Sequence, residues 1–199
     1  MKLLSLFFAL LWVGVAHAQK EPIGFKDFAL GGTFSEFKAR FPDFSCEGGS
    51  CRFEMKTACI SKAIDVTRPS QESFKLAWAC RERNTYGGIP PRSMTASFKD
   101  DKLTQVLIAF TNGHYDALTS ALITRFGQPS SRAHDVMQNL MGAKFDNEVL
   151  TWTPASTLLR ISKYSSNIEE GSVLITTAEE FAEWRRKQKQ AAEKGAKDL

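Results

Sequence analysis

The four cysteines are the residues whose type and spacing most directly imply a chemical role. An even number of cysteines in an exported chain is typical of structural disulfides. Four cysteines allow three pairings, and their spacing alone does not decide among them. We favour Cys46 with Cys51 across Glu-Gly-Gly-Ser, and Cys59 with Cys80 between neighbouring strands. A zinc site is the alternative, but no CxxC pair occurs and no histidine lies nearby, so we expect no metal and no cofactor.

The histidines beyond the N-terminal segment, His114 and His134, are the candidates for acid–base chemistry. A histidine–carboxylate couple catalyses hydrolysis only when a nucleophile or a bound water lies within hydrogen-bond reach. The sequence contains neither a Gly-x-Ser-x-Gly elbow nor a His-Glu-x-x-His helix. We therefore assign no catalytic residue, and a small histidine-dependent hydrolase remains an alternative function.

Two sets of residues in predicted connections are candidates for contact with a partner. Loops held by a rigid sheet commonly supply binding residues, and methionine-rich connections repack against different partners. The alternatives are that the first set is a plain strand connection and that the second covers the open end of the sheet. The candidates are Tyr86, Ile89 and Arg92 in one connection and Met137, Leu140 and Met141 in the other.

The first 18 residues have the pattern of a secretory signal peptide. Lys2 precedes an apolar run that ends near Val15, and Ala16-His17-Ala18 fits the small-x-small cleavage pattern. The run is too short for a membrane anchor, and no second long apolar segment follows it. These features predict a periplasmic or secreted protein with no transmembrane segment after cleavage.

The charge of the chain is concentrated at its C-terminal end. The whole sequence carries a net charge of +4, and residues 183–199 hold six basic residues against three acidic ones. The remainder is therefore close to neutral, which argues against a nucleic-acid-binding face. The basic end is a candidate for weak contact with an anionic surface, although it lacks the apolar side of a membrane-lying helix.

The clearest secondary-structure pattern runs from Ser93 to Pro129. Two runs of residues flank Lys99-Asp100-Asp101-Lys102, and Val106, Ile108 and Phe110 alternate as in a half-buried strand. After Gly113 the period becomes helical, and Gly127 marks the helix end. A hairpin followed by an amphipathic helix is therefore expected at the centre of the fold.

The rest of the chain is predicted to repeat this mixture of helices and strands. Thr33 and Thr177 each begin a capping-box pattern, so helices are expected after both residues. Segment 128–147 is expected to be irregular, with one helical turn near 136–140. The predicted strands are 51–60, 74–83, 149–153, 157–164 and 172–176.

These elements predict an α+β fold in which about six antiparallel strands have helices on one face, followed by a C-terminal helix. We expect a single domain at 19–182, made of two helix-plus-meander units at 23–92 and 93–182, and a basic end at 183–199. Arg40-Phe41-Pro42 and Arg125-Phe126-Gly127-Gln128-Pro129 mark the same place in both units.

This repeated helix, proline stop and meander resembles exported α+β modules such as the β-lactamase inhibitor protein and the assembly lipoprotein BamE. The resemblance rests on Thr33–Pro42, Tyr115–Pro129 and the strands after each. It implies binding to another protein through the sheet face and loops, although no functional residue can be matched. The leading hypothesis is therefore a non-catalytic protein that recognises another envelope macromolecule, as an inhibitor or assembly accessory. A carrier of a small apolar ligand is a further alternative.

Overall fold

The computed structural model describes residues 24–61, 70–139 and 141–196. The predicted signal peptide and the candidate residue Leu140 lie outside this part of the chain. Within it, eight strands form one antiparallel sheet, and β1 (Gly24–Phe25) and β2 (Phe28–Ala29) form a separate ribbon. The α+β class and the antiparallel sheet are confirmed, with eight strands where about six were predicted.

The large sheet consists of two four-stranded meanders that meet at its centre, with the order β3-β4-β5-β6-β10-β9-β8-β7. The central contact is the antiparallel pairing of β6 with β10. The strands are β3 (Ser45–Glu47), β4 (Ser50–Glu54), β5 (Ser93–Lys99), β6 (Lys102–Thr111), β7 (Ser131–Gln138), β8 (Lys144–Trp152), β9 (Thr157–Ser162) and β10 (Glu170–Thr177).

A helix precedes each meander, so the chain builds the same arrangement twice. Helix α1 (Phe34–Arg40) leads into β3 to β6, and α3 (Tyr115–Phe126) leads into β7 to β10. We call these parts unit one and unit two. The strand pairing places β5 and β6 in unit one, so the boundary between the units falls after Thr111 and not at residue 93.

The central hairpin forms as its sequence predicts. Asp100 and Asp101 occupy the turn with φ values of 51° and 62°, a conformation that aspartate tolerates better than most residues. Val106, Ile108 and Phe110 are almost fully buried on the inner face of β6, whereas Leu107 on the outer face is 41% exposed. The alternation therefore fixes which face of the sheet is buried.

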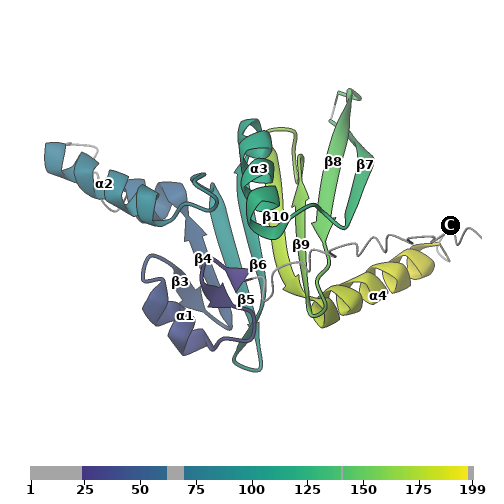
Figure 1. Cartoon of the computed structure of the whole chain (residues 1–199), viewed down its shortest axis with the longest axis horizontal. Coiled ribbons are helices and arrows are strands. Elements are labelled where there is room, and N and C mark those ends of the chain that lie inside the picture. Colours follow the sequence, from purple (N-terminus) through teal and green to yellow (C-terminus); the bar gives the residue numbers. More distant parts are fainter. Residues whose placement is uncertain (1–23, 62–69, 140, 197–199) are drawn as a thin grey trace, which may run out of the picture.

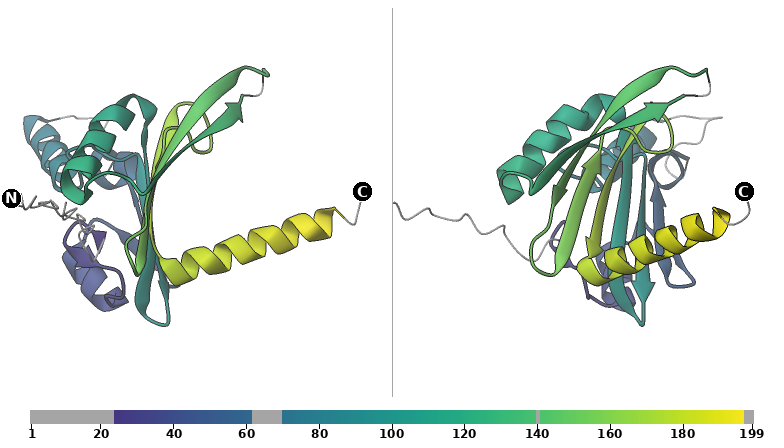
Figure 2. Two further views of the ribbon diagram at one scale, coloured as in Figure 1. Left: turned by 45° about the vertical axis from the view of Figure 1, so that its right-hand side comes forward. Right: turned by 90° about the vertical axis from the view of Figure 1, so that its right-hand side faces the viewer.

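The core lies between this inner face and the helices α1 and α3. Thr33 forms the predicted capping box with Glu36, and α1 contributes Phe37 to a cluster of aromatic rings. Helix α3 contributes the buried residues Tyr115, Leu118, Leu122 and Phe126. Figure 2 shows α1, α2 (Gln71–Arg83) and α3 on one side of the sheet.

Helix α4 (Ala178–Gly195) is the predicted C-terminal helix, and it lies apart from the other helices. It leaves the end of β10 and projects from the opposite side of the sheet (Figure 2). Thr177 caps its first turn by accepting a hydrogen bond from the Glu180 backbone N–H, as predicted. Because α4 has no buried residue, its attachment depends on its first turns.

The prediction of a strand at 74–83 is wrong, because this segment lies in α2. The alternation of Phe74, Leu76, Trp78 and Cys80 resembled a half-buried strand, but the first three side chains are 55–61% exposed. The decisive local signal is Ser70, whose side chain accepts a hydrogen bond from the Ser73 backbone N–H and begins a helix.

Two further strand predictions need correction. The predicted strand 51–60 ends early, because β4 stops at Glu54 and a π-helical turn, η1 (Lys56–Ser61), follows. Segment 128–147, predicted to be irregular, contains β7 and the beginning of β8. Strand β7 is a polar edge strand with almost every side chain exposed, so it lacks the alternation that identifies a half-buried strand.

Candidate functional site

The two units differ most in the connection between their second and third strands. In unit two, residues 153–156 join β8 to β9 directly. In unit one, residues 55–92 separate β4 from β5 and contain η1 and α2. We call η1 and α2 together the arm. Figure 1 shows the arm extending away from the sheet. Because unit two completes its meander without such an insertion, the arm is the part of the fold most open to a separate role.

The arm is held together by a disulfide. Cys59 in η1 is bonded to Cys80 in α2, with their Cα atoms 5.4 Å apart. The second disulfide joins Cys46 to Cys51 across the β3–β4 hairpin. Both preferred pairings are therefore present, although Cys59–Cys80 connects two helical segments and not two strands.

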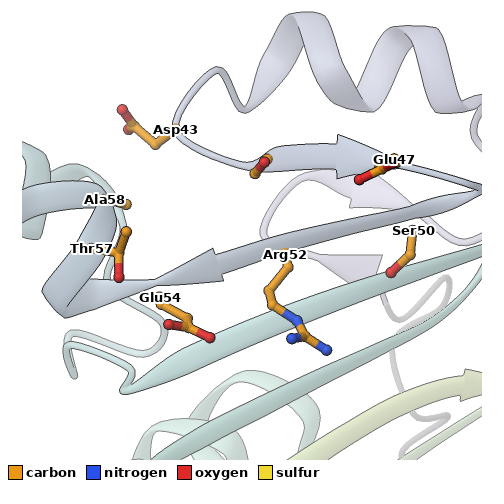
Figure 3. A pocket seen from close by; sticks show the side chains of 8 residues that line it. Asp43, Glu47, Ser50, Arg52, Glu54, Thr57 and Ala58 are labelled. Atoms are coloured by element: carbon orange, nitrogen blue, oxygen red, sulfur yellow. The ribbon is translucent and has the colours of Figure 1, made fainter. Parts of the chain in front are cut away.

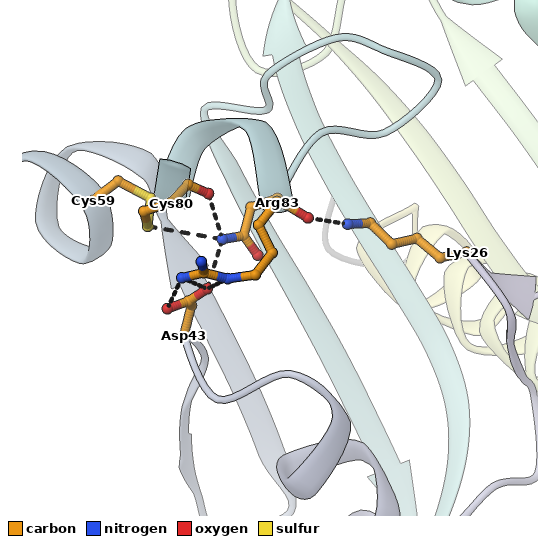
Figure 4. A network of polar contacts seen from close by, with 6 residues as sticks. Lys26, Asp43, Cys59, Cys80 and Arg83 are labelled. Atoms are coloured by element: carbon orange, nitrogen blue, oxygen red, sulfur yellow. Dashed lines mark hydrogen bonds and ion pairs between the residues drawn. A yellow bond between two sulfur atoms is a disulfide. The ribbon is translucent and has the colours of Figure 1, made fainter. Parts of the chain in front are cut away.

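A polar network fixes the C-terminal end of the arm to the body (Figure 4). Arg83 donates two hydrogen bonds to Asp43, at 2.9 and 3.0 Å. The buried Asn84 amide donates to Asp43 and to the Cys80 carbonyl, both at 2.8 Å. Lys26 donates to the Arg83 carbonyl at 2.6 Å. These contacts set the direction in which α2 leaves the sheet.

The network also shifts the pKa values of two of its members, Arg83 and Lys26. Hydrogen bonding to Asp43 raises the pKa of Arg83 above its usual value. Burial, with a smaller contribution from the charge of Arg83, lowers the pKa of Lys26. The positive charges are therefore held close together, and Asp43 is the carboxylate that both Arg83 and Asn84 contact.

The arm encloses a groove with a volume of about 920 Å³ over one end of the sheet. Its floor consists of the ends of β4, β5, β6 and β10, and α2 forms one wall. We call it the arm groove, defined by Glu54, Met55, Lys56, Cys59, Ile60, Phe74, Ala77, Trp78, Arg81, Pro90, Pro91, Arg92, Ser93, Thr111, His114 and Glu170.

The arm carries half of the large hydrophobic side chains that are exposed in the described structure. Among the described residues, eight large hydrophobic side chains are exposed, and four of them are Ile60, Phe74, Leu76 and Trp78. Phe74, Ala77, Trp78 and Arg81 line the groove at helical spacing, so one face of α2 is directed into it. Such a concentration on a single insertion is typical of an interaction site.

Charged groups surround this apolar wall. Arg92 forms an ion pair with Glu170 at 2.8 Å, linking the start of β5 to the start of β10. The Arg81 guanidinium lies over the Trp78 ring at 5.6 Å. Within the described parts of the chain, neither Arg81 nor Lys56 has a carboxylate within 4 Å. The groove therefore has two cations that form no ion pair with any residue the structure describes.

The histidines lie in different places, and neither is part of an identifiable catalytic arrangement. His114 is exposed at the groove, where Ser93 and Thr111 supply hydroxyl groups, but no hydrogen bond joins His114 to either of them in the described structure. His134 pairs with Asp146 at 3.0 Å on the exposed β7–β8 hairpin. The hydrolase alternative stays a prediction, without support from these distances.

Of the predicted contact residues that the structure describes, Arg92 alone lines the arm groove. Tyr86 is only 7% exposed; its ring stacks on Phe25 at 6.1 Å, and burial raises the pKa of its hydroxyl. Ile89 is partly buried against the core and exchanges two backbone hydrogen bonds with Tyr86. Tyr86 and Ile89 therefore anchor their loop to the core and do not form the surface of the groove.

The two described methionine candidates lie elsewhere. Met137 is partly buried on β7, and Met141 is 93% exposed in the turn between β7 and β8. Strand β7 is the edge strand of unit two, whereas the arm belongs to unit one. The two predicted sets therefore do not form one surface.

Sequence reasoning missed the groove residues on the arm, namely Ile60, Phe74, Trp78 and Arg81. The available signal was the helical spacing of Phe74, Trp78 and Arg81 after the capping residue Ser70. Once 74–83 was interpreted as a strand, its exposed aromatic side chains were assigned to the sheet core.

Two smaller hollows, each about 390 Å³, lie on the sheet. One is polar and lies along β3 and β4, where Glu47, Arg52 and Glu54 are among its lining residues (Figure 3). The other lies beneath the first turns of α4 and includes Leu107, Leu174 and Trp184. The arm groove is more than twice as large as either and carries the greater exposed aromatic surface.

The described residues contain no group of three or more histidine, cysteine or acidic side chains placed to hold a metal ion. None of the helices in the described ranges has the length and apolar character needed to cross a bilayer. Searches against protein-family models, curated proteins and solved structures found no match to this chain.

Proposed function

We propose that this chain is an exported binding protein that recognises another protein of the cell envelope through the arm groove. The observation that carries the proposal is the arm itself, an insertion that the other unit lacks and that exposes two large aromatic side chains beside a groove. Aromatic and arginine side chains are enriched at the energetically dominant positions of protein interfaces. An inhibitor and an assembly accessory both fit this description.

The two disulfides support the extracytoplasmic location that the proposal includes. Two disulfides persist most readily in an oxidising compartment such as the periplasm or the exterior of the cell. The proposal also keeps the resemblance to the exported inhibitor and assembly modules, which implies a sheet built from two helix-plus-meander units. Periplasmic or secreted placement therefore belongs to the proposal, as does an envelope partner.

Site-specific photocrosslinking tests this function. A benzoylphenylalanine residue replaces Trp78 in the oxidised protein, and the matched control carries it at Trp184, which is similarly exposed on α4. In a periplasmic extract, position 78 is expected to give a discrete crosslinked product that excess wild-type protein suppresses and excess Trp78→Ala does not. The same product at both positions, or no product at position 78, would refute partner binding through the groove.

The carrier hypothesis has one observation in its favour, because the groove volume lies within the usual range for small-molecule sites. Such sites usually bury about 70–90% of a ligand, however, and Trp78 in this wall is 61% exposed. Native mass spectrometry of the purified protein tests this second candidate. A stoichiometric bound mass that disappears in Trp78→Ala would favour a carrier over a protein-binding module.

The basic end of α4 is a further, weaker part of the proposal. Residues 185–196 are exposed, and Arg185, Arg186 and Lys194 form no ion pair with another described residue. Weak contact with an anionic surface would follow from this charge. Co-sedimentation with phosphatidylglycerol vesicles, but not with phosphatidylcholine vesicles, is the expected result, and it should disappear at high salt.

A further inference from the structure

Backbone N–H and C=O groups at the floor of the arm groove already form hydrogen bonds within the protein, so few can pair with a partner strand. The Met55 backbone N–H donates to the Arg92 carbonyl at 3.0 Å, and the Arg92 N–H donates to the Ala109 carbonyl at 2.8 Å. The Asn112 N–H donates to the Glu169 carbonyl at 2.9 Å. The edge strands of the large sheet are β3 and β7, and neither lines the groove. Strand addition is therefore not the recognition mode that this groove offers.

The wall of the groove offers side-chain packing in its place. Phe74 and Trp78 are one helical turn apart on α2, and Ile60 lies on the adjoining η1. Such a row forms a ridge against which another helix can pack, with the two helix axes about 8–10 Å apart. An amphipathic helix inserts apolar side chains at i, i+3 or i+4 and i+7 into grooves of this kind.

The charges of the groove select one kind of helix. Lys56 and Arg81 have no ion-pair partner among the described residues, whereas the acidic Glu170 is already paired with Arg92. The fixed charges of the groove are Lys56, Arg81 and Arg92 against Glu54 and Glu170, so the surplus is positive. A basic helix would be repelled here, and an acidic one would be attracted.

We infer that the occupant of the arm groove is an acidic amphipathic α-helix of the partner protein. Its apolar side packs on Phe74 and Trp78, and its flanking carboxylates lie near Lys56 and Arg81. This inference rests on the proposed function, because it specifies what the partner presents to the same groove.

Fluorescence anisotropy with designed peptides tests the inference. The probe is an 18-residue labelled helix with leucines on one face and glutamates beside them, and its matched control has lysines in place of the glutamates. The glutamate peptide is expected to bind the oxidised protein at least about fivefold more tightly at low salt, with the difference shrinking as salt rises. A third peptide, with two central prolines, is expected to lose binding because it cannot form the helix.

Variants of α2 distinguish binding in the groove from nonspecific hydrophobic binding to the rest of the arm. Trp78→Ala is expected to weaken binding by about tenfold or more. Leu76→Ala changes a side chain that is equally exposed on the same helix but does not line the groove, so little change is expected. Arg81→Glu should reverse the preference toward the lysine peptide, whereas Lys75→Glu, outside the groove, should preserve it.

The outcomes distinguish this inference from the proposed function. Crosslinking at position 78 without binding of either helical peptide would overturn the helix and leave partner recognition standing. Equal binding of both charge forms would overturn the acidic character of the helix. A concentration-dependent dimer in sedimentation experiments that Trp78→Ala abolishes would assign the groove to a second copy, and displacement of the peptide by dodecanoate alone would assign it to a small amphiphile.

Discussion

Units one and two of this chain share a helix and a four-stranded meander, yet they are stabilised differently. Unit one has a short helix, a cluster of phenylalanine rings, both disulfides and the arm. Unit two has a longer helix whose buried face combines two leucines with Tyr115 and Phe126, no disulfide and a direct turn between β8 and β9. Unit two forms the same meander without cross-links or an insertion, so a meander of this kind can form without those features of unit one.

The largest expected effect tests the difference between the two helices. The Arg-Phe pairs that end α1 and α3 make Phe37 the counterpart of Leu122, and both are buried. Phe37 lies among five other rings, with centroid distances of 4.6 Å to Phe41 and 5.2 Å to Phe44. We expect Phe37→Ala to cost about 4 kcal/mol of unfolding free energy and Leu122→Ala about 3 kcal/mol.

Urea denaturation followed by far-ultraviolet circular dichroism measures both values. Equal costs would mean that the aromatic cluster adds nothing to the packing of unit one. A larger cost for Leu122→Ala would reverse the proposed contrast.

The next effect separates the two disulfides of unit one. Removing Cys59–Cys80 with paired serine substitutions releases a loop of sequence separation 21, and removing Cys46–Cys51 releases one of separation 5. The chain-entropy model gives about 3 kcal/mol for the first and about 2 kcal/mol for the second. Only the first should abolish binding, because Cys59 and Cys80 connect the segments that form the arm.

Hydrogen exchange provides the control for this pair of variants. Loss of Cys59–Cys80 is expected to deprotect the amides of α2 while those of β6 and β10 remain protected. Equal protection of α2 with and without the disulfide would show that the polar network alone holds the arm.

A smaller effect concerns that network. Asp43→Ala removes the acceptor for the Arg83 guanidinium and for the buried Asn84 amide, so we expect a loss of about 2 kcal/mol. Asp27→Ala is the matched control, because Asp27 is highly exposed and its ion-pair distances are 3.9–4.0 Å; its effect should stay below about 0.5 kcal/mol. Equal losses in thermal unfolding would place the stabilising contact elsewhere.

Much of this architecture could be predicted from the sequence because its burial pattern is periodic. The central hairpin is recognisable from the alternation of Val106, Ile108 and Phe110 on a half-buried strand. Helix α3 is recognisable because its buried residues Tyr115, Leu118 and Leu122 lie on one face. Thr33 and Thr177 mark helix starts through their local hydrogen bonds. Both disulfide pairs were favoured correctly, although sequence could not exclude the other pairings.

The parts that sequence could not predict are those in which burial does not follow secondary structure. Helix α2 exposes Phe74, Leu76 and Trp78. The spacing of its hydrophobic residues therefore does not identify a face that packs on the core. Strand β7 has no buried face and therefore no alternation. The arm groove depends on the approach of residues as distant as Ile60, Arg92 and Glu170, which only the sheet topology brings together.

Helix α4 qualifies the contrast between the units, because it follows unit two but is tied to unit one. Lys99, at the β5–β6 turn, donates to Glu183 on α4 at 3.1 Å. Hydrogen bonds from Lys187 and Lys99 lower the pKa of Glu183 from 4.5 to about 2. A carboxyl group with a lowered pKa stabilises the folded arrangement above its unfolded pKa and loses that contribution as pH falls.

The smallest predicted effect follows from this linkage. The contribution of Glu183 to α4 docking should be complete above pH 4.5 and should disappear as pH falls toward about 2. In Lys99→Ala the pKa of Glu183 should rise but stay below 4.5, since Lys187 remains one turn away at 2.9 Å. Carboxyl-carbon NMR titration measures this pKa directly, with Lys38→Ala, a substitution of a lysine on α1, as the control. An unchanged pKa in Lys99→Ala would mean that Lys187 alone sets the charge of Glu183, and that α4 belongs electrostatically to unit two.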